Sequence, residues 1–442
     1  MLLRYSKSFF KEIFFYKNLP SFLLISLPLL LISGSFLPDL AVTLSSIIFV
    51  INSIRNNLIK YYKNFFFFGF LCFYIILIFS SIFSNYPIQS LPTSLFYLRF
   101  AIFALSTWHL ISLDSKIINY FFYSISTAFV ILIVDGYFQF FNGNNLLGWP
   151  IYGTRVSSLF GEELILGSYI SRLLPVLFAC LIVVAKSQKK KYLIFFSIVI
   201  FVLSDVLVFL SGERAALFYI NIGALILIFV LNSYKKFRFF SFTLSIFIIL
   251  ILSMYYPKFK ERVFDQTLNQ ISLSKSFNFS SDTKRDAAHF FTIEHDFLYK
   301  SSIAIFLDNK FLGAGPRLFR VECKNPKYFK AIFSCSTHSH NTYIQLLAET
   351  GIFGFFLIFS AFVLLSFYFL KHFFIRIKHN NHIFSDFELS LMTAIFVTLW
   401  PLIPTGNFFS NWINIIYYLP VGFLLYSLDK KNKLKIQVSK LK

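Results

Sequence analysis

The sequence predicts an all-α polytopic membrane protein with about twelve transmembrane helices and one large extracytoplasmic helical loop. Of its 442 residues, 57% are hydrophobic and only 14% are charged, a composition typical of membrane proteins. A bilayer core about 30 Å thick requires roughly 20 apolar residues per helical span, and twelve runs of about that length follow one another along the chain. Basic residues also concentrate in alternate loops between these runs, as they do in proteins that cross a membrane repeatedly.

The expected spans divide around a single long polar stretch. They are 20–35, 38–54, 65–84, 92–112, 117–140, 163–185, 192–210, 214–231, 240–255, 343–370, 386–404 and 412–428. The first two are short and share a bend at 34–39, so the number of spans is approximate. We therefore expect spans one to nine in 1–255, an outer loop at 256–341, and spans ten to twelve with a basic cytoplasmic tail in 342–442.

The distribution of basic residues predicts that both termini lie in the cytoplasm. Almost every Lys and Arg of the short loops then falls on the inner side, and the outer short loops carry only Arg155 and Arg214. A basic N-terminal segment precedes the first apolar run without a small-residue cleavage site, so we expect a retained span. The net charge of +21 then reflects topology and contact with the lipid bilayer, and we expect no nucleic-acid partner. The 64 Phe residues, spread through every span, are expected to face lipid.

The segment 256–341 is the expected active region because it is the only long polar stretch. Its Lys and Arg outnumber its Asp and Glu, so it should attract an anionic ligand. Apolar residues at helical spacing in 282–312 predict one or two helices at the membrane mouth, ended by the Gly-Ala-Gly-Pro sequence at 313–316. Cys323 and Cys335 share this outer loop, where disulfides persist, so we expect a bridge between them.

Polar residues within spans or at their ends are costly in lipid and need a structural or functional reason. The residues concerned are Arg99, Asp135, Arg172, Asp205, Arg214 and Glu349. For Arg99, Asp135 and Asp205 we expect Arg–Asp pairs that hold helices together. For Glu349 we expect a structural pairing with Arg172 or a similar residue. Most of these residues fall toward the outer half of the spans, which predicts a polar chamber beneath the outer loop.

The polar cluster in 335–356 has three interpretations. His338 and His340 could bind a metal with Glu349, although a third ligand at a recognised spacing is missing. His340 and Asn341 could cap the following helix, with Asn341 supplying the N-cap oxygen. Alternatively, an imidazole held at a helix start, titrating near neutral pH and reachable by a hydroxyl nucleophile, could serve as a catalytic base.

Four segments resemble, in order, the O-antigen ligase and polymerase superfamily, whose members transfer glycans from a polyprenyl diphosphate carrier. The most specific is His340-Asn341, followed after nine residues by Gly351-Ile352-Phe353-Gly354. The other three are SGERAAL at 211–217, RDAAHFF…DNKFLGAGPRLF in 285–319, and RVSSLFGEELILGSYI at 155–170. Together they cover roughly residues 150–370.

The resemblance implies an inverting glycosyltransferase of lipopolysaccharide biosynthesis that transfers a glycan from undecaprenyl diphosphate to lipid A–core. It implies a bacterial inner membrane location and an active site facing the periplasm. Arg214 and Arg285 match arginines of the family pattern, and with Arg155 they would stabilise the negative charge of the diphosphate. His340 would take the proton from the acceptor sugar hydroxyl. No metal or cofactor is expected, since no carboxylate pair of the metal-dependent glycosyltransferases is found. Further candidates for the site are Arg317, Asn341 and His338.

Three other functions remain open at this point. An O-antigen polymerase, which extends carrier-linked repeat units, would use a different acceptor at a similar site. A transporter would also fit twelve spans, but no repeated broken-helix pattern marks two related halves. Protein O-oligosaccharyltransferases of the same superfamily typically carry a further soluble C-terminal region, whereas here about fourteen residues follow the last expected span. The ligase is therefore the favoured function.

Overall fold

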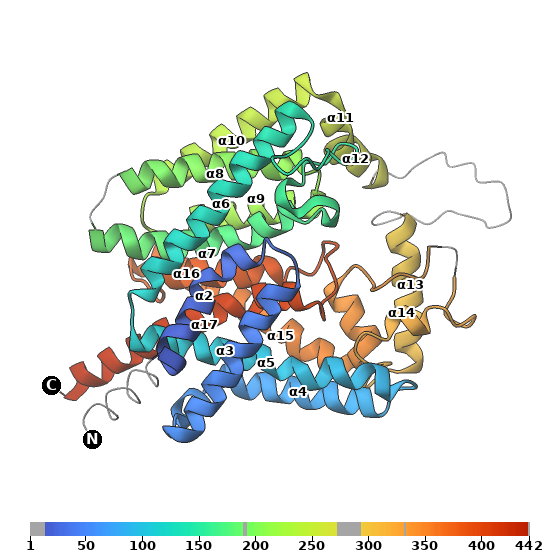
Figure 1. Ribbon diagram of the computed structural model, residues 1–442, viewed down its shortest axis with the longest axis horizontal. Coiled ribbons are helices and arrows are strands. Elements are labelled where there is room, and N and C mark those ends of the chain that lie inside the picture. Colours follow the sequence, from blue (N-terminus) through green and yellow to red (C-terminus); the bar gives the residue numbers. More distant parts are fainter. Residues whose placement is uncertain (1–13, 189–191, 272–292, 331–332, 441–442) are drawn as a thin grey trace.

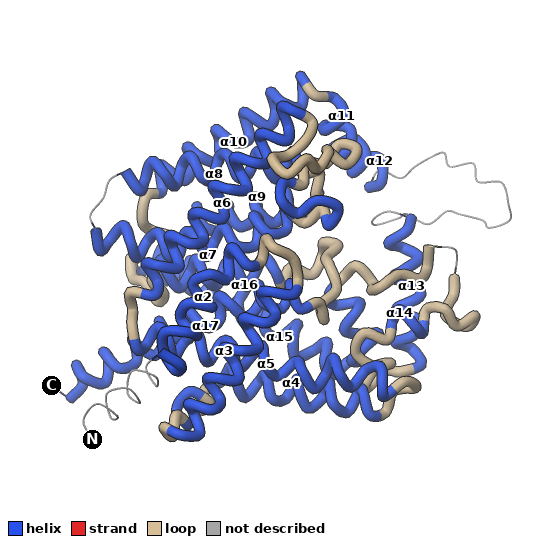
Figure 2. Tube along the Cα trace, viewed as in Figure 1, coloured by secondary structure: helices blue, strands red, loops and turns tan. Residues whose placement is uncertain are grey.

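Helices form all the regular structure in the part of the chain that the computed structural model describes, residues 14–188, 192–271, 293–330 and 333–440. Two isolated β-bridges are the only strand-like pairings among these residues. Figure 2 shows helices joined by loops throughout. The prediction of an all-α chain is confirmed for the described residues.

The elements follow the expected order. The first half of the chain contains η1 (Phe14–Asn18), α2 (Leu19–Leu30), α3 (Phe36–Arg55), η2 (Ile59–Tyr61), α4 (Phe65–Ile82), α5 (Pro87–Leu113), α6 (Ile117–Asn142), η3 (Ser158–Glu163), α7 (Leu166–Gln188), α8 (Tyr192–Leu210) and α9 (Arg214–Val230). The second half contains α10 (Lys235–Tyr255), α11 (Pro257–Lys260), η4 (Glu261–Asp265), α12 (Gln266–Ile271), α13 (Ile293–Asp308), α14 (Phe319–Glu322), α15 (Thr342–His379), α16 (Asp386–Thr398) and α17 (Asn411–Lys440).

Every expected span corresponds to a helix, but only part of them have the length and composition of a membrane span. Among the described residues, 8 helices are long and apolar enough to cross a membrane, namely α3, α4, α5, α6, α7, α8, α10 and α15. The stretch Phe15–Leu30 and helix α9 are apolar but shorter. Helix α16 has 13 residues, which at 1.5 Å per residue is about 20 Å, less than a bilayer core. The count of twelve spans therefore stays a prediction.

The helices α5 and α7 form the centre of the helical body. They are the most buried of the candidate spans. Helix α5 packs against α3, α4 and α17, and α7 packs against α6, α8, α9 and α16. By contrast, Phe65 and Phe68 on α4 and Phe247 and Leu250 on α10 are more than half exposed. An apolar exterior around a packed interior is the arrangement that a lipid environment requires.

The helices from segment 256–341 gather at one end of the molecule. Figure 1 shows α11, α12, α13 and α14 at the end opposite the C-terminal end of α17, and Figure 2 shows long loops beside them. Helix α13 corresponds to the helical pattern expected in 282–312, of which 282–292 lies outside the described residues. This end of the molecule carries the candidate site.

A close backbone contact fixes this end to the long helix α15. Gly351 interrupts α15 with φ 64°, and Gly313 also has a positive φ, 69°. A Cβ atom on Gly351 would lie 2.2 Å from the carbonyl oxygen of Phe311. The amide groups of Ala314 and Gly315 donate to carbonyl groups of α15 at 2.9 and 3.0 Å. The two glycine motifs of the sequence thus meet, because only glycine permits this backbone conformation and approach.

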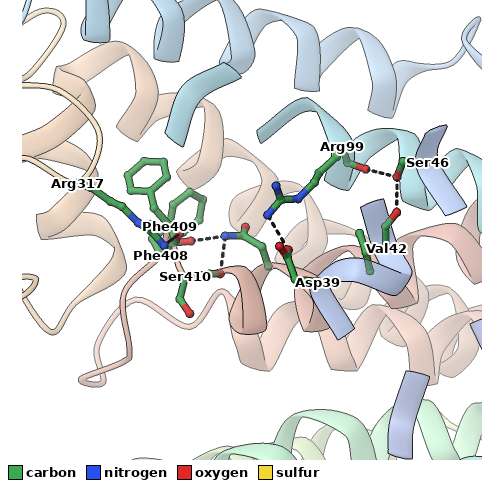
Figure 3. Close-up of polar contacts among 9 residues, drawn as sticks. Asp39, Val42, Ser46, Arg99, Arg317, Phe408, Phe409 and Ser410 are labelled. Atoms are coloured by element: carbon green, nitrogen blue, oxygen red, sulfur yellow. Dashed lines mark hydrogen bonds and ion pairs between the residues drawn. The ribbon is translucent and has the colours of Figure 1, made fainter. Parts of the chain in front are cut away.

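The polar residues inside the helices are paired, although not all as expected. The expected Arg–Asp pair exists for Arg99, whose guanidinium lies 2.6 Å from the carboxylate of Asp39 (Figure 3). Asp135 instead accepts hydrogen bonds from the Ser158 hydroxyl and from backbone and amide donors. Asp205 accepts from the hydroxyl of Ser245 and the amide of Asn221. Neutral donors satisfy these two carboxylates, so the expectation of an arginine partner was wrong for them.

Glu349 differs from expectation in the same way. Its carboxylate accepts hydrogen bonds from the backbone amide of Phe319 at 3.0 Å and from the side chain of Gln345 at 2.9 Å. Arg172 instead donates to Thr405 and lies over the ring of Tyr219. Glu349 therefore holds the start of α14 against α15 and does not pair with Arg172.

Candidate functional site

Three histidine rings meet between helix α13 and the loop that enters α15. The ring centroids of His338 and His340 are 4.0 Å apart. The ring of His295, from α13, lies edge-on to that of His340 at 5.5 Å. A hydrogen bond of 2.7 Å from Ser302 on α13 to Ser339 fixes the helix against the loop. We call His295, His338 and His340 the histidine cluster.

The backbone around His340 sets the direction of its side chain. Asn341 caps α15, because its side-chain oxygen accepts from the amides of Tyr343 and Ile344 at 3.0 and 3.1 Å. His340 itself has a positive φ of 55°, which is uncommon for a residue other than glycine. Its carbonyl oxygen accepts from the amide of Thr405 at 2.9 Å. The capping interpretation is therefore right for Asn341, and it leaves the imidazole of His340 unused by the cap.

Burial keeps the histidine cluster in its neutral form. It lowers the pKa of His338 to about 3, and the neighbouring His340 acts in the same direction. Burial also lowers the pKa of His295 to about 4, helped by His340 and Arg214. The pKa of His340 is lowered by burial as well, but the negative charge of Glu294 opposes this shift. At neutral pH these rings are therefore uncharged and can accept a proton. The carboxylate of Glu294 would stabilise the charged form of His340.

Three arginines surround the turn between α8 and α9. Arg155 donates from Nε to the carbonyl of Ser211 at 3.2 Å, and Arg262 donates from Nε to the carbonyl of Gly212 at 3.3 Å. Arg214 is the first residue of α9, and its guanidinium lies 3.5 Å from the hydroxyl of Thr267. We call Arg155, Arg214 and Arg262 the arginine cluster.

Gly212 makes the close approach of these side chains possible. Its φ is 63°, and a Cβ atom there would lie 2.9 Å from Cδ of Arg262 and 3.2 Å from Cγ of Arg155. The pKa of Arg155 is lowered by burial and by the charge of Arg262, while Glu213 raises it. The Glu213 carboxylate already accepts from the amides of Gly167 and Ser168, at 2.7 and 3.0 Å, at the start of α7. Glu213 offsets the charge of Arg155, while the charge of Arg262 acts unfavourably on both Arg155 and Arg214. Such a gathering of positive charge favours an anionic ligand.

The two clusters are electrostatically linked, since the charge of Arg214 contributes to the lowered pKa of His295. Sequence reasoning missed His295 and did not select Arg262 among the basic residues of the outer segment. One signal could have pointed to His295. It lies in the helical pattern of 282–312 and falls in the first turn of α13. Arg262 had no motif around it, and only the fold of α11, η4 and α12 over the α8–α9 turn brings it there.

The remaining candidates fall into separate places. Arg285 lies outside the described residues, and its role stays a prediction. Arg317 stands apart from the arginine cluster: it donates to the carbonyl of Phe409 at 2.8 Å, and its charged neighbours are Arg320, Glu349, Arg99 and Asp39.

Cys323 and Cys335 are bonded in the structure, with Cα atoms 5.1 Å apart. The bridge joins the end of α14 to the loop that precedes His338 and His340. Within the described ranges, no group of three or more His, Cys, Asp and Glu side chains is arranged to hold a metal ion.

The arrangement can bind an anion and accept a proton at adjacent positions. Arginine forks match the oxygen geometry of phosphate groups and keep their charge at all relevant pH values. Neutral imidazoles beside them can receive a proton from a hydroxyl group. This combination suits a group transfer in which the leaving group is a phosphate-bearing anion and the nucleophile is an alcohol.

A comparison with protein families matches residues 196–359 to the family described as O-antigen ligase. The matched segment runs from α8 to the middle of α15 and includes Arg214, Arg262 and the three histidines. No curated protein matches the chain. Over residues 196–359, this match supports the family that the sequence motifs predicted.

Proposed function

We propose, from the match of residues 196–359 to the O-antigen ligase family, that the protein transfers a glycan from undecaprenyl diphosphate to lipid A–core. The transfer would take place at the outer face of a bacterial inner membrane, with the segment 256–341 in the periplasm and both termini in the cytoplasm. The superfamily also includes polymerases that extend carrier-linked glycans. We propose a ligase and treat a polymerase as the alternative.

The observation that carries the proposal is the electrostatic effect of the arginine cluster on the histidine cluster. The arginine cluster offers charge for a diphosphate, and the charge of Arg214 reaches His295, which itself lies against His340. A carrier diphosphate bound at the arginines would therefore have its sugar close to a neutral imidazole. This is the geometry that an acceptor hydroxyl needs for attack on the anomeric carbon.

The reaction would follow from these charges. The acceptor oxygen bonds to the anomeric carbon from the face opposite the diphosphate, and the bond from that carbon to the diphosphate oxygen breaks. His340 takes the hydroxyl proton, and Glu294 stabilises the resulting imidazolium, consistent with its effect on the pKa of His340. Arg214, Arg155 and Arg262 stabilise the released lipid diphosphate, and Arg285 is retained as a fourth candidate.

Disruption of the gene followed by electrophoresis of surface glycans tests the proposal. Loss of a ligase should leave carrier-linked polymer intact and lipid A–core without polymer. Loss of a polymerase should instead leave core that bears a single repeat unit, and this result would replace the ligase by the polymerase. Complementation with a well-expressed Arg214→Ala variant should fail in the same way as an empty vector, whereas the native gene should restore the capped core.

A further inference from the structure

A cationic cavity lies away from the arginine cluster, between α5 and the start of α17. Its volume is about 170 Å³, and its lining includes Arg99, Arg317, Thr93, Phe96 and Asn411. Figure 3 shows the side chains of Arg99 and Arg317 reaching toward each other from opposite sides, the first from α5 and the second beside the segment that contains Phe409. The cavity is therefore built by parts of the chain that are far apart in sequence.

Both arginines are held in place but keep unused donors. Arg99 donates to Asp39 at 2.6 Å, and Arg317 donates from Nη2 to the carbonyl of Phe409 at 2.8 Å. Nε of each guanidinium is buried and has no hydrogen-bond partner among the described residues. A buried donor without a partner is costly, and a ligand oxygen in the cavity would satisfy it.

The charge of the cavity is positive. Two carboxylates, those of Asp39 and Glu349, lie near its two arginines, and Arg320 adds a third positive charge near Arg317, so positive charges outnumber negative ones. Asn411, which lines the cavity, is the first residue of α17, and the amide groups of a helix start favour anions. Arg317 also has a positive φ of 62°, a strained conformation that directs its side chain into this place.

The surroundings of the cavity are apolar and exposed. Phe96 lines the cavity and is 64% exposed. Leu37 and Leu40, on either side of Asp39 at the start of α3, are also exposed. These side chains belong to α3 and α5, both helices with the length and composition of membrane spans. The cavity therefore opens beside a surface that suits acyl chains.

We propose that this cavity binds the phosphate group of a membrane lipid, with the phosphate between Arg99 and Arg317 and the acyl chains along α3 and α5. The guanidinium groups of Arg99 and Arg317, including their unused Nε donors, and the amides at the start of α17 would donate hydrogen bonds to the phosphate oxygens. Free phosphate shares this chemistry, but it would gain nothing from the apolar surface beside the cavity. The site is separate from the donor site of the proposed function, since the charged neighbours of Arg317 include none of Arg155, Arg214 and Arg262.

Native mass spectrometry of the purified full chain tests this site. The protein is equilibrated with detergent micelles that contain phosphatidylglycerol, and the number and affinity of retained lipids are measured. The variants are Arg317→Gln, which removes one guanidinium, and Asn411→Asp, which places a negative charge in the cavity while both arginines remain. The control is Arg55→Gln, at the other end of a membrane helix, where the guanidinium contacts Tyr16.

The native protein and Arg55→Gln should retain the lipid equally. Arg317→Gln and Asn411→Asp should each weaken retention by about tenfold or more, because each alters a charge-assisted contact. Equal retention by Asn411→Asp and the native protein would overturn the proposal, even if Arg317→Gln failed to fold. Displacement of the lipid by millimolar inorganic phosphate, with equal thermal stabilisation by phosphate alone, would also overturn it by assigning the site to the free ion.

Discussion

A single methyl group at Gly313 tests how tightly the outer segment is joined to α15. Gly313 has a φ of 69°, and a Cβ atom there would lie 2.3 Å from the carbonyl carbon of Glu349 and 2.3 Å from the amide nitrogen of Thr350. Both neighbours are backbone atoms, which cannot rotate away as a side chain can. Gly313→Ala should therefore separate the two segments that the glycine motifs bring together.

The cost has two parts that other glycines can separate. An alanine in the left-handed region costs about 1–2 kcal/mol relative to glycine, and forcing apart a packed contact costs about 1–3 kcal/mol. Gly34→Ala carries only the first cost, since its φ is 110° and no atom lies within 4 Å of its Cβ position. Gly69→Ala, in α4, carries neither, because no positive φ and no close atom occur there.

Thermal unfolding in detergent, followed by the monomer fraction in size-exclusion chromatography, measures these effects. We expect Gly69→Ala to be at least as stable as the native protein, because alanine favours a helix interior more than glycine does. Gly34→Ala should lose a little stability, and Gly313→Ala should lose the most, roughly 2–5 kcal/mol. Glycan transfer should fall together with stability in Gly313→Ala, because Glu349 and the start of α14 move with this contact. A Gly313→Ala protein as stable as Gly69→Ala would refute the tight junction between Gly313 and α15.

Three further predictions concern the chemistry of the site. Purified protein should transfer glycan in excess chelator, and activity that disappears with chelator and returns with a divalent cation would contradict metal-independent transfer. Mass spectrometry of unreduced peptides should find Cys323 linked to Cys335, a ring whose closure contributes on the order of 3 kcal/mol in a chain-entropy model; two free thiols would end this prediction. Because the pKa of His340 lies below its ordinary value of 6.5, a fall in pH should leave transfer intact through about 6.5 and reduce it only at more acid pH, as the imidazole becomes protonated. Loss of transfer with a midpoint above 6.5 would assign the acidic limb to another group.

The helices long enough to cross a membrane were predictable from the sequence because each contains a long apolar run. Their ends were predictable where a local signal exists, as at Asn341, which precedes α15 and caps it. The number of spans was less certain, since α9 is apolar but short and α16 has only 13 residues. The partners of Asp135 and Asp205 could not be predicted, because their neutral donors come from a loop and a neighbouring helix that only the fold brings close.

The site was partly predictable for the same reason. Arg214, His338 and His340 stand in or beside local motifs, and the structure brings them to one end of the molecule. Arg262 and His295 have no motif, and only the packing of distant segments places them beside these residues. Arg317 follows a turn that the sequence did reveal, but its side chain lines a cavity away from these residues, together with residues of α5, Phe409 and the start of α17.

The central claim is that arginines bind the carrier while a histidine moves the proton. Carrier affinity and glycan transfer, measured on the same purified variants, separate these roles. Arg214→Ala and Arg262→Ala should weaken carrier binding as well as transfer, and Arg214→Lys should recover only part of the binding, because an ammonium group cannot replace a bidentate fork.

His340→Asn is the decisive variant. Asparagine tolerates the positive φ of His340, so the backbone should persist while the imidazole is lost. Asn341→Ala is its control, since loss of the cap should lower helix stability by about 1 kcal/mol without removing the base. We predict near-native carrier affinity for His340→Asn and transfer reduced by about 100- to 10,000-fold. Normal transfer by a well-folded His340→Asn protein would contradict the account and leave the arginines as a binding site without a base.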